Sequence, residues 1–160
     1  MSPVKKTMIS ALLLFASVQP LYAQTPAEIM QTFYQVADSR PLDQNKLAGF
    51  FADSFTDHDP QPGHADSNGE MMAAFYDLLL AASEDAVHEI TFIEPVGGNK
   101  ALVRWKWKGT HTGDLFGVPA SGNRFDIAGM ELWEFNDAGK ITGLWHVEDV
   151  AKLFAQIGQQ

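Results

Sequence analysis

Hydrophobic residues in the first half of the chain recur at helical spacing. Thr25 and Glu28 have the spacing of a capping box, and apolar side chains then follow every three or four positions. This pattern predicts an amphipathic helix over residues 26–39. Two further helices are expected, one over residues 41–50 and one from a second capping-box pair, Ser67 and Glu70, to Ala82.

The period of the apolar positions changes at Val87. Four runs rich in β-branched and aromatic residues follow, separated by glycine-bearing turns, at residues 87–94, 101–110, 124–135 and 141–147. They predict a four-stranded antiparallel meander, and a last helix is expected over residues 150–157. Three helices followed by such a sheet indicate the α+β class, with helices packed on a curved, mainly antiparallel sheet. Such a sheet, open at one end, is a natural way to enclose a pocket, although the periodicity alone does not establish one.

The N-terminus has the order of a secretory signal peptide. Lys5 and Lys6 precede an apolar run over residues 8–18, and Ala23 closes a plausible cleavage site. The apolar run is shorter than the roughly 20 residues that span a bilayer. We therefore expect a signal peptide over residues 1–23, a periplasmic or secreted location, and a single domain over residues 24–160 that has no membrane anchor after cleavage.

Composition narrows the possible partners. All 20 acidic residues follow Ala23, whereas two of the 11 basic ones precede it, so the chain from Gln24 carries 9 − 20, or −11. Nucleic acids and anionic membranes are bound through clustered Lys and Arg, so neither is an expected partner. The chain has no cysteine, which excludes disulfides, thiolate metal sites and thiol nucleophiles.

A turn near the C-terminus brings two chemically useful residues into register. If the hairpin turns between Ala138 and Gly139, opposed residues have numbers that sum to 277, and Glu131 faces His146. Opposed Cβ atoms lie roughly 4.5 to 5.5 Å apart, close enough for a carboxylate to hydrogen-bond an imidazole. The pair is a candidate acid/base dyad, and Trp133 on the same face is a candidate pocket wall.

The opposite face of this hairpin carries more apolar residues, which leaves another interpretation open. Glu131 and His146 would then form an ordinary ion pair on a solvated face. The apolar face, with Met130, Leu132 and Trp145, would need cover from helices or from a second copy in a homodimer.

The remaining histidines are weaker candidates. His58 lies in a polar, proline-marked segment, and His111 opens a glycine-rich connection over residues 109–122 that is long enough to form a flap. His64 and His88 have no chemically suggestive neighbours and are expected at the surface. His58, Glu131 and His146 could supply two histidines and a carboxylate to a metal, but their spacing does not support a metal site, and none is expected.

The second half resembles a known family. The resemblance is carried by Gly109 to Gly113, Phe116 to Pro119, Asp137 to Ile141, Trp145 and Asp149, and it extends back through His58 to the first helix. Together these residues resemble the SnoaL-like polyketide cyclases, often called ester cyclases. The resemblance implies the cone-shaped fold of nuclear transport factor two and ketosteroid isomerase, and intramolecular aldol chemistry without metal or cofactor.

The resemblance also places the family's functional residues on this chain. The catalytic aspartate falls on His146 and its histidine partner on Glu131, so the two chemical types are exchanged. The polar residue of the family's early loop falls on Asp57 or His58, and its loop histidine falls on His111.

These observations lead to one functional hypothesis and one alternative. The hypothesis is a cofactor-independent acid/base enzyme of the cyclase, isomerase or hydrolase kind that acts on a small carbonyl-bearing molecule. His146 would move the proton, Glu131 would orient it, and His58 or His111 would polarise an oxygen, with Asp57 in a binding role. The alternative is a binding module without chemistry, in which Trp133 and Phe55 form the apolar walls.

Overall fold

The computed structural model describes residues 24–60 and 67–158. The predicted signal peptide lies outside these residues, so export stays a prediction, and His64 is outside them as well. Among the described helices, none is long and apolar enough to cross a membrane.

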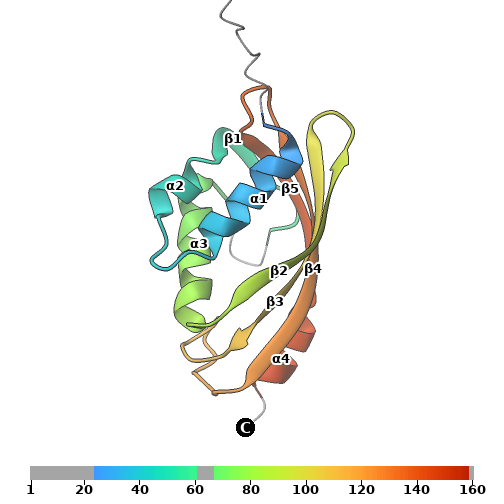
Figure 1. Ribbon diagram of the computed structural model, residues 1–160. Helices are drawn as coiled ribbons and strands as arrows, with labels where there is room; N and C mark the ends of the chain where they lie inside the picture. The colour runs from blue at the N-terminus through green and yellow to red at the C-terminus, as the bar shows by residue number, and fades with distance from the viewer. Residues whose placement is uncertain (1–23, 61–66, 159–160) are drawn as a thin grey trace, which may run out of the picture.

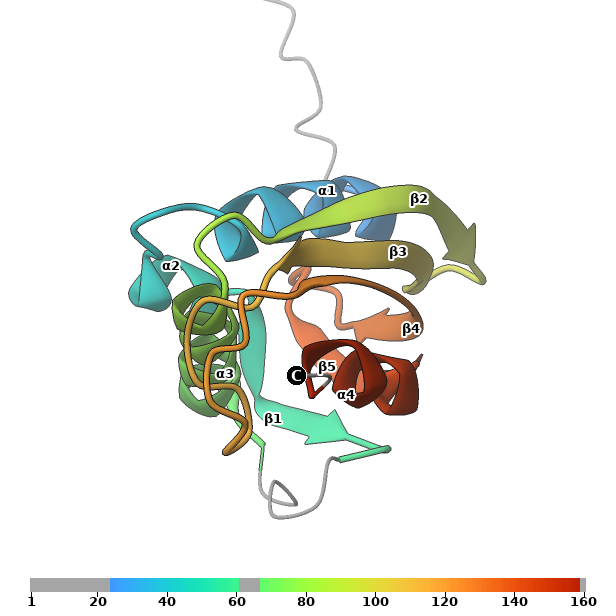
Figure 2. The ribbon, with the colours of Figure 1, turned by 90° about the horizontal axis from the view of Figure 1, so that it is seen from below.

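The fold is a five-stranded mixed sheet with helices against it, which confirms the α+β class (Figure 1). The strands are β1 (Phe51–Asp57), β2 (Val87–Val96), β3 (Lys100–Thr110), β4 (Arg124–Phe135) and β5 (Ile141–Glu148), in the spatial order β1-β5-β4-β3-β2. Strands β2 to β5 form the predicted antiparallel meander, whereas β1 pairs in parallel with β5. Figure 2 shows the strands curling around the interior, with α3 (Gly69–Ala82) and α4 (Val150–Ile157) on its two sides.

The helices begin where side chains cap their free N–H groups. At α1 (Pro26–Ala37) the predicted capping box of Thr25 and Glu28 is present, and the buried face of the helix packs into the core. The short α2 (Gln44–Ala48) is capped by Asp43. The prediction for α3 was wrong by one residue, because Asn68 and not Ser67 is the cap and accepts a hydrogen bond from the backbone of Met71.

Strand β1 was missed in the sequence. Its residues follow the helix predicted over residues 41–50 and were interpreted as the start of a polar, proline-marked segment, because polar residues such as Asp53, Ser54 and Thr56 interrupt the apolar pattern. The strand is held at its two ends by β5: the backbone N–H of Ile141 donates to Phe50 and that of His58 donates to Leu144. A parallel partner distant in sequence therefore makes this strand, and local pattern does not reveal it.

The concave face of the sheet is the buried one. Along β4 the burial alternates, with Glu131 only 6% exposed and Trp133 fully buried on the concave side. On the convex side Met130 and Leu132 are half-buried, and Val147 is 67% exposed. The interpretation of Glu131 and His146 as a pair on a solvated face is therefore wrong, because the helices cover this face despite its polar residues.

Candidate functional site

A cavity of about 400 Å³ lies between the concave sheet face and helices α3 and α4. Its walls are mostly large and apolar, and they include Phe75, Tyr76, Trp105, Trp107, Trp133 and Phe154. Its polar side chains are fewer. Besides Ser67 and the Tyr76 hydroxyl, they are the titratable Asp57, His88, Glu131, His146 and Glu148. An apolar cavity of this size with a few convergent polar groups has the character of a small-molecule site.

His146 lies between two carboxylates in this cavity. Its Nδ1 is 2.6 Å from Glu148 Oε1, and its Nε2 is 3.0 Å and 3.3 Å from the two carboxylate oxygens of Asp57. The side chains of His146 and Asp57 are each 8% exposed. Both ring nitrogens therefore face acceptors, the arrangement that a protonated imidazolium requires.

The charge state of His146 follows from these neighbours. Burial alone would lower its pKa, but the hydrogen bond and charge of Glu148, with the charges of Asp57 and Glu131, outweigh burial and raise the pKa from 6.5 to about 9. His146 is therefore a cation at neutral pH. A group with this pKa acts as a proton donor or an electrophile and is a poor base at pH 7.

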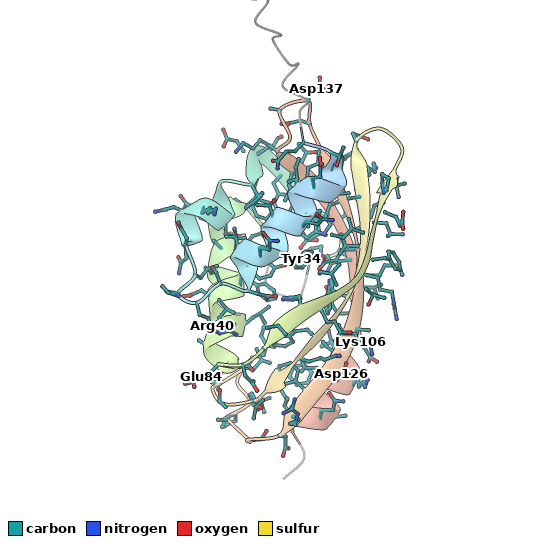
Figure 3. The ribbon with its side chains drawn as sticks, in the orientation of Figure 1. Tyr34, Arg40, Glu84, Lys106, Asp126 and Asp137 are labelled. Carbon is teal, nitrogen blue, oxygen red and sulfur yellow. The ribbon has the colours of Figure 1, made fainter. Side chains whose placement is uncertain are left out.

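Glu131 is held by other residues. One carboxylate oxygen accepts hydrogen bonds from the hydroxyl of Tyr34 and from the indole N–H of Trp133, the latter at 2.9 Å. Tyr34 reaches it from α1, where that helix crosses the sheet (Figure 3). Burial raises the pKa of Glu131, while the Tyr34 hydrogen bond opposes the rise. Burial and the neighbouring Glu131 charge raise the pKa of Tyr34 well above its usual value, so Tyr34 remains a donor.

The predicted register of Glu131 and His146 is therefore correct, but the predicted hydrogen bond between them is absent. Glu131 and His146 are directly opposed across β4 and β5, as the hairpin arithmetic predicted. No hydrogen bond joins them, because the imidazole nitrogens bind Asp57 and Glu148, and the Glu131 carboxylate binds Tyr34 and Trp133. Glu131 acts on His146 only through its charge.

A second histidine that lines this cavity, His88, is paired with a carboxylate outside it. Nδ1 of His88 is 2.7 Å from Asp38 Oδ1, and the side chain of His88 is only 6% exposed. The prediction that His88 is a surface residue is thus wrong. A bulge between Ile90 and Phe92 shifts the pairing of β2 with β3 by one residue, so His88 opposes Trp107 on the concave face.

The sequence matches the model of a known protein family. A family model described as SnoaL-like polyketide cyclase matches residues 27–157. The chain belongs to this family. That membership confirms the resemblance found in the sequence and supports small-molecule chemistry that needs no cofactor. No curated protein matches the chain.

Solved structures of the SnoaL-like fold superpose over most of the chain. TsrD from Streptomyces laurentii has a TM-score of 0.68 and 24% identity, over 81% of this chain and 95% of its own. IdmH from Streptomyces antibioticus has a TM-score of 0.70 and 22% identity, over 85% and 100%. A SnoaL-like polyketide cyclase from Agrobacterium tumefaciens has a TM-score of 0.66 and 16% identity, over 83% and 98%. At these identities the likeness establishes the cone fold.

The other predicted site residues of this SnoaL-like chain divide into two groups. Asp57 and Trp133 line the cavity as expected. His58 is exposed, and its ring stacks on Trp145, with centroids 4.0 Å apart, on the convex side. It directly follows Asp57, the last residue of β1, and points to the opposite face of the sheet. Phe55 packs in the core against Phe51, with ring centroids 4.8 Å apart, and does not line the cavity.

His111 was predicted to bind the ligand, and the structure places it in the base of the glycine-rich connection. It is fully buried, its Nδ1 accepts from the backbone of Ser121, and its main chain bonds to Gly122 and Asn123. It does not line the cavity, because it anchors the two ends of the loop. The residue of this loop that lines the cavity is Phe116.

Phe116 marks the mouth of the cavity. It adopts a positive φ of 53°, is 45% exposed, and lies between Phe75 of α3 and Phe154 of α4, with ring centroids 6.2 Å and 6.3 Å away. The loop thus brings Phe116 into the cavity wall between α3 and α4, and its role as a flap stays a prediction. Across residues 24–60 and 67–158, no group of three His, Cys, Asp or Glu side chains is arranged to hold a metal ion.

Proposed function

We propose that the cavity is the active site of a cofactor-independent acid/base enzyme acting on a small carbonyl-bearing molecule. The observation that carries the proposal is the His146 imidazolium, held between Glu148 and Asp57 inside an apolar cavity. Buried charges of this kind are concentrated at functional sites. The role of His146 changes from the base expected in the sequence to the acid.

The two carboxylates have different parts in this proposal. The short bond from Nδ1 to Glu148 fixes the ring, whereas Asp57 shares the Nε2 proton between two oxygens at 3.0 Å and 3.3 Å. The second contact is the weaker one, and a substrate carbonyl oxygen replaces it. The imidazolium then withdraws electron density from the carbonyl, which makes the neighbouring C–H group more acidic.

Proton exchange tests the proposal without knowledge of the natural substrate. 2-Tetralone is a compact bicyclic ketone that suits an apolar cavity of about 400 Å³, and its C1 hydrogens exchange with solvent through the enol. In D2O, followed by proton NMR, the wild-type chain from Gln24 should accelerate this exchange over buffer. His146→Gln should lose at least about 100-fold of the acceleration, since positioned acid/base groups contribute about 10² to 10⁴.

Glu89→Gln provides a matched control. Glu89 pairs with Lys108 on the exposed convex side, away from the cavity. The Glu89→Gln variant should accelerate the exchange of 2-tetralone as much as the wild type does. A wild-type rate equal to buffer would refute the proposal, as would full activity of a folded His146→Gln variant.

A binding module without chemistry is the second candidate. It is favoured by the predominance of aromatic and aliphatic side chains in the cavity wall. This alternative predicts saturable binding of 2-tetralone, measured by tryptophan fluorescence, with no exchange above the buffer rate. It also predicts that Glu131→Gln leaves the dissociation constant unchanged.

Export and dimer formation are also part of the proposal. The N-terminal pattern of residues 1–23 supports export, and cell fractionation followed by N-terminal sequencing of the mature protein tests it, with Gln24 as the expected first residue. The convex face, with Val147 67% exposed beside Met130, supports a homodimer through the sheet. Sedimentation at micromolar concentration tests the dimer, and a monomer would contradict it.

A further inference from the structure

His88 is held more firmly than an ordinary cavity histidine. Its backbone N–H donates to one carboxylate oxygen of Asp38 at 2.8 Å, and its Nδ1 lies 2.7 Å from the other oxygen. Asp38 is the residue that caps the C-terminal end of α1, so helix and strand are joined at this point. Both oxygens of one carboxylate therefore fix the position of the imidazole.

Aromatic rings fix the plane of the imidazole. Trp105 meets it edge-on at 5.3 Å, Trp107 lies nearly parallel at 6.3 Å, and Tyr76 and Tyr34 approach within 5.9 Å and 5.3 Å. The ring lines the cavity that contains His146, and it also lines a groove between α1 and β2 on the other side. Rotation of the ring would break these contacts and the bonds to Asp38.

This arrangement determines which nitrogen carries the proton. A carboxylate only accepts hydrogen bonds, so in the neutral ring Nδ1 is protonated and Nε2 has the free lone pair. Among the described residues, none forms a hydrogen bond with Nε2. The titratable groups around the ring are Asp38 at the C-terminal end of α1, Tyr34 from α1, Tyr76 from α3 and Glu131 from β4.

We propose that His88 is the proton acceptor of the cavity and that Asp38 is its positioning residue. This inference rests on the proposed function. In that function His146 is the acid, so a second residue must accept the proton, and His88 is that residue. The C–H bond next to the substrate carbonyl breaks, and its proton moves to Nε2 of His88. The electron pair moves onto the carbonyl oxygen, which receives the Nε2 proton of His146. The product is the enol, with His88 protonated against Asp38 and His146 neutral.

The role of Asp38 in this step is electrostatic and geometric. Its carboxylate keeps Nδ1 protonated, so that Nε2 is the basic atom, and it stabilises the imidazolium that forms. Asp38 also lines the groove outside the cavity, where its side chain is 18% exposed. The pair therefore lies between the cavity and the outer groove, with the imidazole facing the cavity and the carboxylate facing the groove.

Exchange at C1 of 2-tetralone in D2O tests this inference with two variants and the Glu89→Gln control. His88→Gln should lower the accelerated rate by at least about 100-fold. Its dissociation constant for 2-naphthol, a planar mimic of the enol, should change by less than about threefold. Asp38→Asn should also lower the rate, and Asp38→Glu should restore part of it because a carboxylate is again present. A purely structural role would not separate rate from binding in this way.

Nitrogen NMR of the histidine-labelled wild type tests the same inference without any substitution. The neutral His88 ring should carry its proton on Nδ1, and addition of 2-naphthol should shift the Nε2 resonance. A proton on Nε2 with Nδ1 bare would overturn the inference, as would His88→Gln exchanging within twofold of wild type. If the wild type gives no exchange above buffer, the proposed function itself fails. If the wild type accelerates exchange and His88→Gln does so equally well, only the inference about His88 fails.

Discussion

The raised pKa of His146 predicts a loss of stability at alkaline pH. A group whose pKa is higher in the folded than in the unfolded protein binds its proton more tightly in the folded state, and this preference stabilises the fold at low pH. That stabilisation is complete below the unfolded pKa, near 6.5, and is lost as the pH rises through the folded pKa of about 9. The window in which the fold weakens is therefore pH 6.5 to about 9.

The magnitude follows from the size of the shift. A rise from 6.5 to about 9 is equivalent to about 3 to 4 kcal/mol, because one pKa unit corresponds to about 1.4 kcal/mol. Solvent at the open side of the cavity screens part of this interaction, so we expect about 2 kcal/mol. Urea unfolding at about pH 6 and about pH 9.5 measures it, with His146→Gln as the reference. The stability advantage of the wild type over this variant should shrink by that amount.

The comparison with His146→Gln removes the contributions of other titrating groups. His58→Gln is the matched control, since it removes an exposed imidazole that forms no ion pair with the described residues. The difference between wild type and this control should change little with pH. Parallel stability curves for wild type and His146→Gln over the whole window would show that Asp57 and Glu148 do not hold a cation, and the argument for an acid would be refuted.

Two substitutions test the packing that supports the site. Gly129→Ala should destabilise the fold by about 1 to 3 kcal/mol in urea unfolding, because its Cβ would lie 2.2 Å from Cζ2 of Trp105; unchanged stability would show that the indole does not lie over β4. Tyr34→Phe should cost about 1.5 to 3 kcal/mol in the same assay at pH 7, because it removes a donor from the buried Glu131 carboxylate; a neutral effect would show that Trp133 satisfies this carboxylate alone.

Most of the fold could be predicted because most of its elements have a regular apolar period. The bounds predicted for β4 and α4 agree with the structure, and β2, β3 and β5 differ only by one or two residues at their ends. Strand β1 could not be predicted, because its stability depends on a parallel partner about 90 positions later in the sequence. Which sheet face is buried depends on where the helices pack. The face with more apolar residues was expected to be the buried one, but the helices cover the face that carries Glu131 and His146.

The candidate site could be predicted only in part. Hairpin arithmetic placed Glu131 opposite His146, and the resemblance to the SnoaL-like family brought Asp57 into the same region. The partners of these groups depend on side-chain directions in three dimensions, so the bonds to Glu148 and Tyr34 were not found. His88 was missed for a different reason: without the bulge in β2, pairing from the hairpin turn would place it opposite Lys108 on the convex face.

The most direct test of the central claim is the rate of solvent exchange at C1 of 2-tetralone with the wild-type protein at neutral pH. An acid/base site built on the His146 imidazolium predicts exchange faster than in buffer, largely lost in His146→Gln and retained in Glu89→Gln. Binding of 2-tetralone in the cavity with exchange no faster than in buffer would contradict the claim and identify the cavity as a binding site alone.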